Sequence, residues 1–314
     1  EDVIRDCLLS RGLGDGYKRR LVSSDKGVRT VAREVYVNGA FVDASVACVS
    51  VFDRGFLFAD AVYEVVAVID GALVDFDAHQ ARLQRSLAEL AIDYDPLENG
   101  LINIYRELRE RNQLEEGLIY LQISRGVADR SFIKPRAVAP SVVLFTQAAA
   151  LLGAPEAARG LRVMSCPDLR WHRRDIKTTQ LLYSSLMKSQ AIAAGFDDVF
   201  MLDGETVTEG SSSNAHILTH DGVLVTRPLS NDILHGITRA AVLDYAREQG
   251  LTVEERVFTL TEAQAAKEAF ITSATAFVMP VVEIDGVPVG DGVVGPGVER
   301  MRALYIAESR RRMH

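Results

Sequence analysis

Alternating hydrophobic and polar positions run through much of the chain and predict strands that are joined by tight turns. Residues 34–43, EVYVNGAFVD, alternate on both sides of Asn38-Gly39, a pair that is typical of a two-residue hairpin turn. Asp70-Gly71, Asp203-Gly204 and Asp221-Gly222 also stand between strand-like runs and predict three more hairpins. Because hairpins join antiparallel neighbours, we expect mainly antiparallel sheets.

Other apolar segments follow the helical period. In residues 77–92, Leu83, Leu87 and Leu90 fall on one helical face. Further helices are expected over residues 97–113, 179–194, 236–250 and 295–312. Since the strands come in hairpins and the helices are grouped beside them, the pattern predicts an α+β fold and disfavours a doubly wound parallel sheet.

Composition divides the chain into four predicted parts. Residues 1–32 are polar and charged, and we interpret them as an N-terminal extension with a helix near residues 3–9. Residues 33–147 are expected to form a small N-terminal α+β domain. Residues 148–157 are rich in alanine and contain Pro155, which is typical of an interdomain linker, and residues 158–314 would form a larger C-terminal domain.

Charge and cysteine content narrow the class of protein. The 314 residues carry a formal net charge of −8, which disfavours a general nucleic-acid role because phosphate binding needs a basic face. No apolar run approaches the roughly 20 residues of a membrane-spanning helix, and the first residues lack the pattern of a secretory signal. Cys7, Cys48 and Cys166 have neither metal-type nor disulfide-type spacing, so we expect reduced thiols in a cytoplasmic protein.

Several common catalytic motifs are absent from the sequence. It contains no GxxxxGK[ST] nucleotide loop, no GxSxG motif and no HExxH motif. The six histidines are scattered, and no pair has a metal-ligand spacing on a predicted helix, so we expect no metal site. Cys166 is interpreted as a buried small hydrophobe rather than as a nucleophile.

Two residues suggest chemistry with an amine and an aromatic ring nitrogen. Lys177 lies between Ile176 and a predicted helix in RWHRRDIKTTQLL. A lysine in a partly apolar site loses proton affinity and can form an imine, although a surface lysine in a charged turn would give the same pattern. Glu209 follows in TVTEGSSSN. A buried carboxylate needs a partner such as a pyridinium nitrogen; a strand-ending turn that is capped by its serines is the alternative.

Three further segments offer groups for a phosphate. Residues 236–238, Gly-Ile-Thr, begin a predicted helix whose free amides and dipole suit a phosphate, although Thr238 would also serve as an ordinary N-cap. Residues 273–275, Ser-Ala-Thr, end a predicted strand and offer amides and hydroxyls. Arg82 lies on a polar helix face, where it is either a surface residue or a phosphate ligand.

The order of these motifs resembles one enzyme family. DIK, VTEGSSSN, ILxGITR and a TS-containing strand follow one another as in the fold-type IV family of pyridoxal-phosphate enzymes. Its members include D-amino-acid aminotransferases, branched-chain aminotransferases, (R)-selective amine transaminases and aminodeoxychorismate lyases. The resemblance covers about residues 34–305. It implies two α+β domains with mainly antiparallel sheets or barrels, pyridoxal 5′-phosphate between the domains, and a homodimer whose partner closes the pocket.

The resemblance assigns roles position by position. Lys177 matches the Schiff-base lysine and proton shuttle, and Glu209 matches the acid at the pyridine nitrogen. Arg82 matches the phosphate-binding arginine, and Leu234 matches the leucine that packs against the cofactor ring. Ala274 stands where a threonine is common, so a side-chain contact with the phosphate would be lost. The remaining implied cofactor contacts are Ser213, Asn214, Gly236, Ile237, Thr238 and Ser273.

The N-terminal half carries the resemblance to the D-amino-acid subclass. DRGFLFADAVYEVV, residues 53–66, resembles the pattern DRGxxFGDGVYEVV, with Ala59 and Ala61 in place of glycines. The patterns of branched-chain aminotransferases and of (R)-amine transaminases are not matched. The implied substrate contacts are Tyr63, Val65, His79, Tyr120, Arg130 and Phe132.

Phe132 departs from the substrate trap of the subclass. There a tyrosine holds the substrate carboxylate together with an arginine and a histidine of the partner subunit. Tyr63 and Arg130 match the first two, but Phe132 stands where the histidine is expected. Losing a charge-assisted hydrogen bond of about 1.5–3 kcal/mol predicts weaker carboxylate recognition and tolerance of (R)-amines.

Together these features predict a transaminase that moves an amino group from a D-amino acid to pyruvate or 2-oxoglutarate by a ping-pong mechanism. The alternatives within the resemblance are an (R)-selective amine transaminase, a branched-chain L-amino-acid aminotransferase and an aminodeoxychorismate lyase. A non-catalytic relative that only binds the cofactor is the alternative from a different class, and the retention of both Lys177 and Glu209 argues against it.

Overall fold

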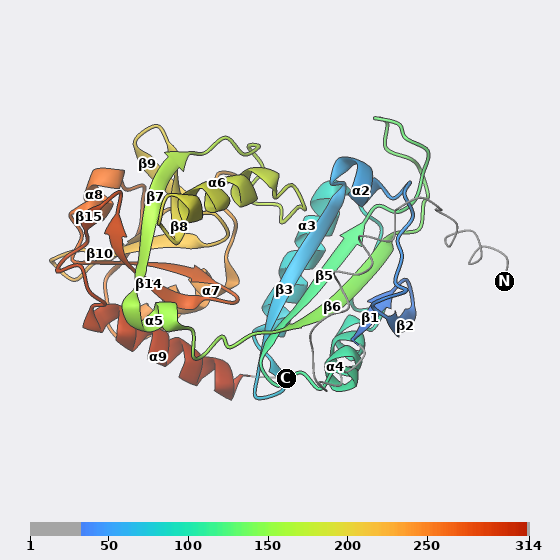
Figure 1. Ribbon diagram of the computed structural model, residues 1–314, viewed down its shortest axis with the longest axis horizontal. Coiled ribbons are helices and arrows are strands. Elements are labelled where there is room, and N and C mark those ends of the chain that lie inside the picture. Colours follow the sequence, from blue (N-terminus) through green and yellow to red (C-terminus); the bar gives the residue numbers. More distant parts are fainter. Residues whose placement is uncertain (1–32, 313–314) are drawn as a thin grey trace, which may run out of the picture. The chain divides into compact units, whose positions relative to one another are not determined.

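The computed structural model describes residues 33–312, so the predicted extension over residues 1–32, with its expected helix, lies outside the described residues. Residues 34–312 belong to one compact unit that contains two sheets with helices beside them (Figure 1). The predicted α+β class is therefore confirmed. The division into two domains with a linker over residues 148–157 stays a prediction, and this segment contains the start of a short helix.

The first sheet uses residues 34–148 and is antiparallel throughout, in the order β2-β1-β6-β5-β3-β4. Its hairpins turn at the predicted Asn38-Gly39 and Asp70-Gly71 pairs, where all four residues have the positive φ that such turns require. Its strands are β1 (Glu34–Val37), β2 (Ala40–Asp43), β3 (Ala61–Ile69), β4 (Ala72–Leu73), β5 (Gly117–Ser124) and β6 (Ser141–Ala148).

The second sheet is mixed, in the order β12-β11-β10-β13-β14-β7-β8-β9, with β15 paired to β14. Three pairs are parallel, namely β7 with β8, β7 with β14 and β11 with β12. Helix α6 (Leu182–Ala193) connects β7 to β8 and helix α7 (Ile237–Glu248) connects β11 to β12, since a hairpin cannot join parallel partners. β7 and β14 are far apart in the sequence. The strands are β7 (Leu161–Pro167), β8 (Asp198–Asp203), β9 (Thr206–Gly210), β10 (Asn214–Leu218), β11 (Leu224–Thr226), β12 (Val253–Glu255), β13 (Glu268–Ser273), β14 (Phe277–Ile284) and β15 (Val287–Pro288).

The five helices predicted within residues 33–312 are present, and two of them begin three or four residues later than expected. The helix expected from residue 97 begins at Leu101, because the Asp95 side chain first closes a turn by accepting from the amides of Leu97 and Glu98. The patterns missed three five-residue helices. The helices are α2 (Arg54–Phe58), α3 (Phe76–Leu90), α4 (Leu101–Arg111), α5 (Pro155–Arg159), α6 (Leu182–Ala193), α7 (Ile237–Glu248), α8 (Leu260–Gln264) and α9 (Pro296–Arg311).

The helix expected from residue 179 begins at Leu182 because the preceding residues extend along β3 instead. The Tyr63 amide donates to the Lys177 carbonyl at 3.0 Å, and the Thr179 amide donates to the Ala61 carbonyl at 3.2 Å. Ile176 is buried in the hydrophobic core of the first sheet, among side chains of β3 and α3. The backbone around Lys177 is therefore fixed to the first sheet, although the strands that precede and follow it in the sequence, β7 and β8, belong to the second sheet.

A shared hydrophobic cluster also joins the two sheets. Ile69 of β3 packs in the same cluster as Phe277 of β14 and Tyr305 of α9. The Tyr305 hydroxyl donates to the Asp75 carboxylate, which precedes α3, at 2.7 Å. No helix within residues 33–312 has the length and apolarity that crossing a bilayer requires.

The packing of α3 against β3 supports both the core and the site, and its loss should destabilise the fold. Leu83 of α3 is 1% exposed, so Leu83→Ala should lower the free energy of unfolding by about 2–5 kcal/mol. Urea denaturation measures this change. Leu97→Ala is the control, because Leu97 is 66% exposed and should shift stability by less than about 0.5 kcal/mol. Equal effects of the two substitutions would contradict this account of the core.

Candidate active site

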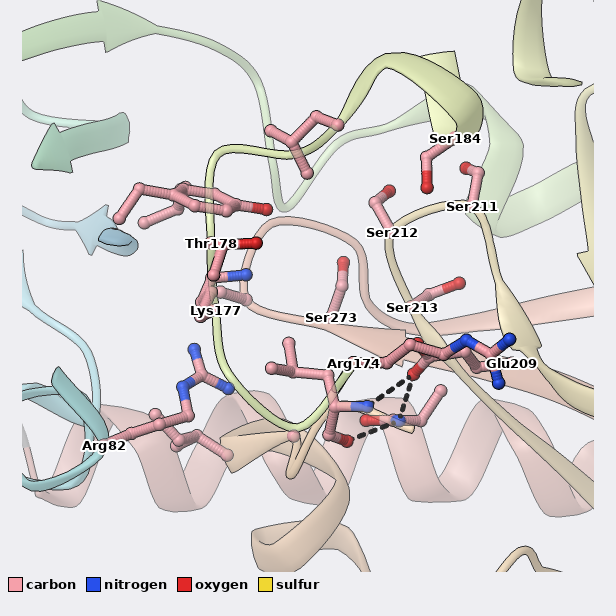
Figure 2. A pocket seen from close by; sticks show the side chains of 18 of the residues that line it. Arg82, Arg174, Lys177, Thr178, Ser184, Glu209, Ser211, Ser212, Ser213 and Ser273 are labelled. Atoms are coloured by element: carbon pink, nitrogen blue, oxygen red, sulfur yellow. Dashed lines mark hydrogen bonds between the residues drawn. The ribbon is translucent and has the colours of Figure 1, made fainter. Parts of the chain in front are cut away.

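One cavity of about 180 Å³ brings together most of the predicted site residues (Figure 2). It is bounded by β3, α3, the segment before α6, the end of β9, the start of α7 and the end of β13. The predicted residues that line it are Tyr63, Val65, His79, Arg82, Lys177, Glu209, Ser213, Asn214, Leu234, Gly236, Ile237, Thr238, Ser273 and Ala274.

Lys177 presents its amine to this cavity. Its Nζ lies 4.1 Å from the centre of the Tyr63 ring, a position that favours a cation over the π face. Within residues 33–312, no carboxylate lies within ion-pair distance of this amine. The Lys177 side chain therefore extends from a fixed backbone, and its amine forms no salt bridge with the described residues. Both properties suit a nucleophile or a proton carrier.

Glu209 lies on β9 and is 3% exposed. Its Oε1 accepts from Arg170 at 2.7 Å, and its Oε2 accepts from the Asn214 amide group and from the Leu234 backbone N–H, both at 3.0 Å. Burial raises the pKa of Glu209, and the Arg170 guanidinium and these hydrogen bonds offset only part of that effect. Glu209 is therefore a buried acid with a raised proton affinity, and it can accept a hydrogen bond from a nearby proton donor.

Arg170 was not among the predicted site residues. It pairs with Glu209 and, through two hydrogen bonds of 2.9 and 2.7 Å, with the buried Asp168. The signal was present in the sequence, since a buried glutamate needs a cation and Arg170 opens the same RWHRRDIK segment that contains Lys177.

Asn214 connects the acid to the start of α7. Besides Glu209, its side-chain amide donates to the Leu234 carbonyl at 2.9 Å. Gly236 packs so closely that a Cβ there would lie 1.9 Å from the Asn214 Oδ1, so a larger residue would displace the Asn214 side chain. Gly236 is also the N-cap of α7 and provides no side-chain cap. The first amides of α7 are thus left for another acceptor.

A buried ion cluster holds Arg82 beside these amides. Its guanidinium donates to both Glu64 oxygens, at 2.8 and 2.7 Å, and to the His235 carbonyl at 3.1 Å. His79 Nδ1 lies 2.7 Å from the same Glu64 carboxylate. Glu64 was not predicted as a site residue, although an acid within the apolar run AVYEVVAV was a signal for a buried partner.

The pKa values in this cluster follow from burial and charge. Burial alone would raise the pKa of Glu64, but the Arg82 guanidinium, its hydrogen bonds and His79 lower it to about 2. Burial lowers the pKa of His79, and the Glu64 carboxylate opposes this only in part. At neutral pH, therefore, Glu64 is ionised and His79 is neutral, and Arg82 remains fixed with donors facing the cavity.

The serines beside Glu209 differ in their hydrogen bonds. Ser211 Oγ donates to Asp198 at 2.5 Å, whereas the buried Ser213 Oγ has no partner within the described part of the chain. Ser273 Oγ accepts from the Ala276 amide at 3.1 Å and so closes the turn after β13. The unpaired Ser213 hydroxyl is a group that a polar ligand would satisfy.

Three predicted substrate contacts lie outside this cavity. Tyr120 lies behind Tyr63, with the two rings stacked at 5.5 Å, and its hydroxyl donates to Gln122. Arg130 and Phe132 are in the exposed loop after β5, and Phe132 is 82% exposed. The prediction places Arg130 and Phe132 at the site of a partner subunit, and their roles stay a prediction.

The residues present fit pyridoxal phosphate. The uncapped amides of α7 and the Arg82 guanidinium suit a phosphate. The buried Glu209 suits a basic ring nitrogen, and the free Lys177 amine suits an aldehyde. In Figure 2, Arg82 and Glu209 lie on opposite sides of the view, with Lys177 nearer to Arg82. One elongated ligand with these three groups would satisfy all of them.

Comparison with known proteins agrees with this arrangement. The sequence profile of the family "Amino-transferase class IV" matches residues 61–284. The chain belongs to the class IV aminotransferases. It is 39% identical to the D-alanine aminotransferase of Staphylococcus aureus over 84% of this chain and 93% of that protein. Identity to the Bacillus licheniformis D-alanine aminotransferase is 40%, over 84% and 92% of the two chains.

Solved structures of class IV aminotransferases share the fold. The branched-chain amino acid aminotransferase of Escherichia coli gives a TM-score of 0.81 at 26% identity, over 88% of this chain and 94% of that one. The T.th. branched-chain amino acid aminotransferase with pyridoxamine 5′-phosphate also gives 0.81, at 27% identity and the same coverage. The predictions of family, fold and a pyridoxal-phosphate-dependent aminotransferase are confirmed.

The Glu64 cluster should make stability depend on acid pH. Its folded pKa of about 2 lies below the ordinary 4.5, so ionised Glu64 stabilises the fold above about pH 4.5, and this contribution is lost as the pH falls toward 2. The shift corresponds to about 3 kcal/mol. Glu64→Gln should therefore lower the free energy of unfolding most at neutral pH, and its difference from the parent should shrink between pH 4.5 and 2.

Urea denaturation across this pH range measures the effect. Glu115→Gln is the control, because Glu115 makes only an exposed pair with Arg109 and its loss should change little at any pH. A constant difference between Glu64→Gln and the parent from pH 7 to pH 2 would contradict the ionised state assigned to Glu64.

Proposed function

We propose that this chain transfers the amino group of a D-amino acid to a 2-oxo acid such as pyruvate or 2-oxoglutarate. The observation that carries the proposal is that one cavity joins Lys177, Glu209 and the start of α7 in a chain 39% identical to a D-alanine aminotransferase. Bound pyridoxal phosphate would supply an electron sink for the electron pair of the broken Cα–H bond.

The proposed roles of the binding residues follow from their positions. Arg82 and the amides of Ile237 and Thr238 would hold the phosphate, with the Glu64 carboxylate keeping Arg82 in place. Leu234 would support the ring, because its backbone is tied to both Glu209 and Asn214. Glu209 would accept the hydrogen bond of a protonated ring nitrogen.

Lys177 is the proposed covalent holder of the cofactor and the proton carrier. Released by the incoming donor, its Nζ would take the proton from the donor Cα and later return a proton to the Cα of the product. Its backbone is fixed along β3, so the side chain alone moves. The two halves of the reaction would use the same amine, which corresponds to ping-pong kinetics.

The assembly and location that we propose go with this reaction. A homodimer would bring the loop with Arg130 and Phe132 of one subunit to the cavity of the other, because these side chains are exposed and outside the cavity of their own chain. The cytoplasm is the proposed location, since free amino acids and 2-oxo acids are the substrates.

Half-reactions with defined amines test the proposal. D-alanine should bleach the visible absorbance of the bound cofactor at least about 100-fold faster than L-alanine, which corresponds to about 2.7 kcal/mol of discrimination. Lys177→Ala should lose this response, whereas the control Lys267→Ala should keep it, because Lys267 is exposed and outside the cavity. Stopped-flow absorbance of the cofactor-loaded protein provides the measurement.

Each rival function gives a different outcome. Bleaching by branched-chain L-amino acids but not by D-alanine would favour the activity named for the solved relatives. Bleaching by (R)-1-phenylethylamine but not by D-alanine would indicate the (R)-selective amine transaminase. Pyruvate release from aminodeoxychorismate without an amino acceptor would indicate the lyase. A cofactor-loaded protein that responds to none of these donors would indicate a non-catalytic relative and would refute the proposal.

Phe132 provides a second test, of the carboxylate trap. Phe132→His should restore a charge-assisted hydrogen bond of about 1.5–3 kcal/mol and raise kcat/KM for D-alanine by roughly 10- to 150-fold. The value for (R)-1-phenylethylamine, which has no carboxylate, should not rise. Ile133→His is the matched control, because Ile133 is equally exposed on the same loop. An equal gain for both donors would contradict the role given to this position.

A further inference from the structure

The buried Arg174 also lines the cavity (Figure 2). Only 6% of its surface is exposed, and its Nε is buried without a partner within residues 33–312. Its other contacts are long: 3.2 Å to the Asp168 carbonyl, 3.3 Å to the Arg170 carbonyl and 3.5 Å to the Asp232 carbonyl. A buried guanidinium held this loosely needs an explanation other than tight structural hydrogen bonds.

Asp168 links this arginine to Glu209. Its carboxylate lies 3.3 Å from Arg174 and 2.7 Å from Arg170, and it accepts from the Thr208 hydroxyl at 2.7 Å. Arg170 in turn reaches Glu209 at 2.7 Å. Arg174, Asp168, Arg170 and Glu209 therefore form a row of alternating charges, in which each group is paired to the next.

The charges of this row balance without a ligand. Two arginines offset two carboxylates, so a positive ring nitrogen beside Glu209 would give the row an excess positive charge. The other groups that face the row change this little. Asp232 is shared between Arg174 at 3.7 Å and Arg227 at 3.3 Å. Burial raises the pKa of the Cys166 thiol to about 11 and raises that of Tyr183, so both are neutral at pH 7.

We propose that Arg174 is a positioning residue that limits how strongly Glu209 binds a positively charged ring nitrogen, and that it acts through Asp168. By sharing Asp168, Arg174 leaves one arm of Arg170 free for Glu209. Without Arg174, Asp168 draws Arg170 more completely, and Glu209 is left to pair with the ring nitrogen. Without the Asp168 charge, Arg170 pairs more strongly with Glu209, and Glu209 binds the ring nitrogen less strongly. This inference rests on the proposed function, because it takes Glu209 to face that nitrogen.

The test compares two cofactors that differ in one atom. The dissociation constants of pyridoxal phosphate and of its analogue with C–H in place of the ring nitrogen are measured on the full-length protein freed of cofactor. The ratio of the two affinities isolates the contact between Glu209 and the nitrogen. Arg174→Met should increase the preference for pyridoxal phosphate about three- to tenfold, the range expected for one partly screened charge. Asp168→Asn should decrease it by a similar factor.

Three further variants separate this effect from a loss of structure. Arg174→Lys keeps the charge and should stay within about twofold of the parent ratio, and the double variant Arg174→Met/Asp168→Asn should return toward it. Arg239→Met is the matched control, because Arg239 is buried, also has an unpartnered Nε and lies outside the cavity lining. It should lower thermal stability as much as Arg174→Met does, with no change in the ratio.

The outcomes distinguish the role of Arg174 from the placement of Glu209 beside the ring nitrogen. A ratio that moves in the same direction in Arg174→Met and Asp168→Asn, or that is as unchanged in Arg174→Met as in Arg239→Met, would overturn the role of Arg174. Glu209→Gln should abolish most of the preference for the ring nitrogen. If Glu209→Gln leaves the ratio unchanged, the placement of Glu209 in the proposed function fails, whatever Arg174 does.

Discussion

The burial of carboxylates at the cavity is the constraint on which the site depends. Glu209 and Glu64 are both almost inaccessible to solvent, and an ionised carboxylate in that setting needs a cation and hydrogen bonds. Arg170 and Arg82 provide the cations. Each pair fixes a different part of the site: the first fixes the acid on β9, and the second fixes the arginine beside the start of α7.

These pairs are maintained by contacts between segments that are distant in sequence. Glu64 comes from β3, Arg82 from α3 and the His235 carbonyl from the loop before α7. Lys177 follows Ile176, which is buried in the core of the first sheet, and its carbonyl pairs with β3. Lys177 and Arg82 are thus positioned by the first sheet, whereas Glu209 and α7 belong to the second. Chemistry and folding therefore depend on the same contacts.

Much of this arrangement could be predicted from the sequence. Turn pairs such as Asn38-Gly39 located the hairpins, because their backbone requirements are local. The order of Lys177, Glu209 and residues 236–238 predicted which residues line the cavity, because each of these motifs is a short continuous segment of the sequence. The partners of the buried charged side chains were harder to predict. The sequence signalled that buried acids needed cations, but only the fold shows which cation meets which acid, namely Arg170 with Glu209 and Arg82 with Glu64.

The short elements and the parallel pairs could not be predicted for a related reason. α2 and α8 are five residues long, too short for a helical period to be visible. The parallel pairing of β7 with β8 and β14 depends on contacts across the whole second sheet. The late start of α6 has the same origin, because residues 177–179 pair with β3 before the helix begins. Non-local pairing, rather than local propensity, decided the parallel pairs and the start of α6.

The central claim is that Lys177 holds pyridoxal phosphate covalently, and borohydride reduction followed by peptide mass spectrometry tests it most directly. Reduction would fix the cofactor to its lysine, and trypsin would then fail to cut at that position. The account predicts one modified peptide, residues 175–188, DIKTTQLLYSSLMK, with the phosphopyridoxyl group on Lys177. A modification on another lysine with Lys177 unmodified, or no modification of the cofactor-loaded protein, would contradict it.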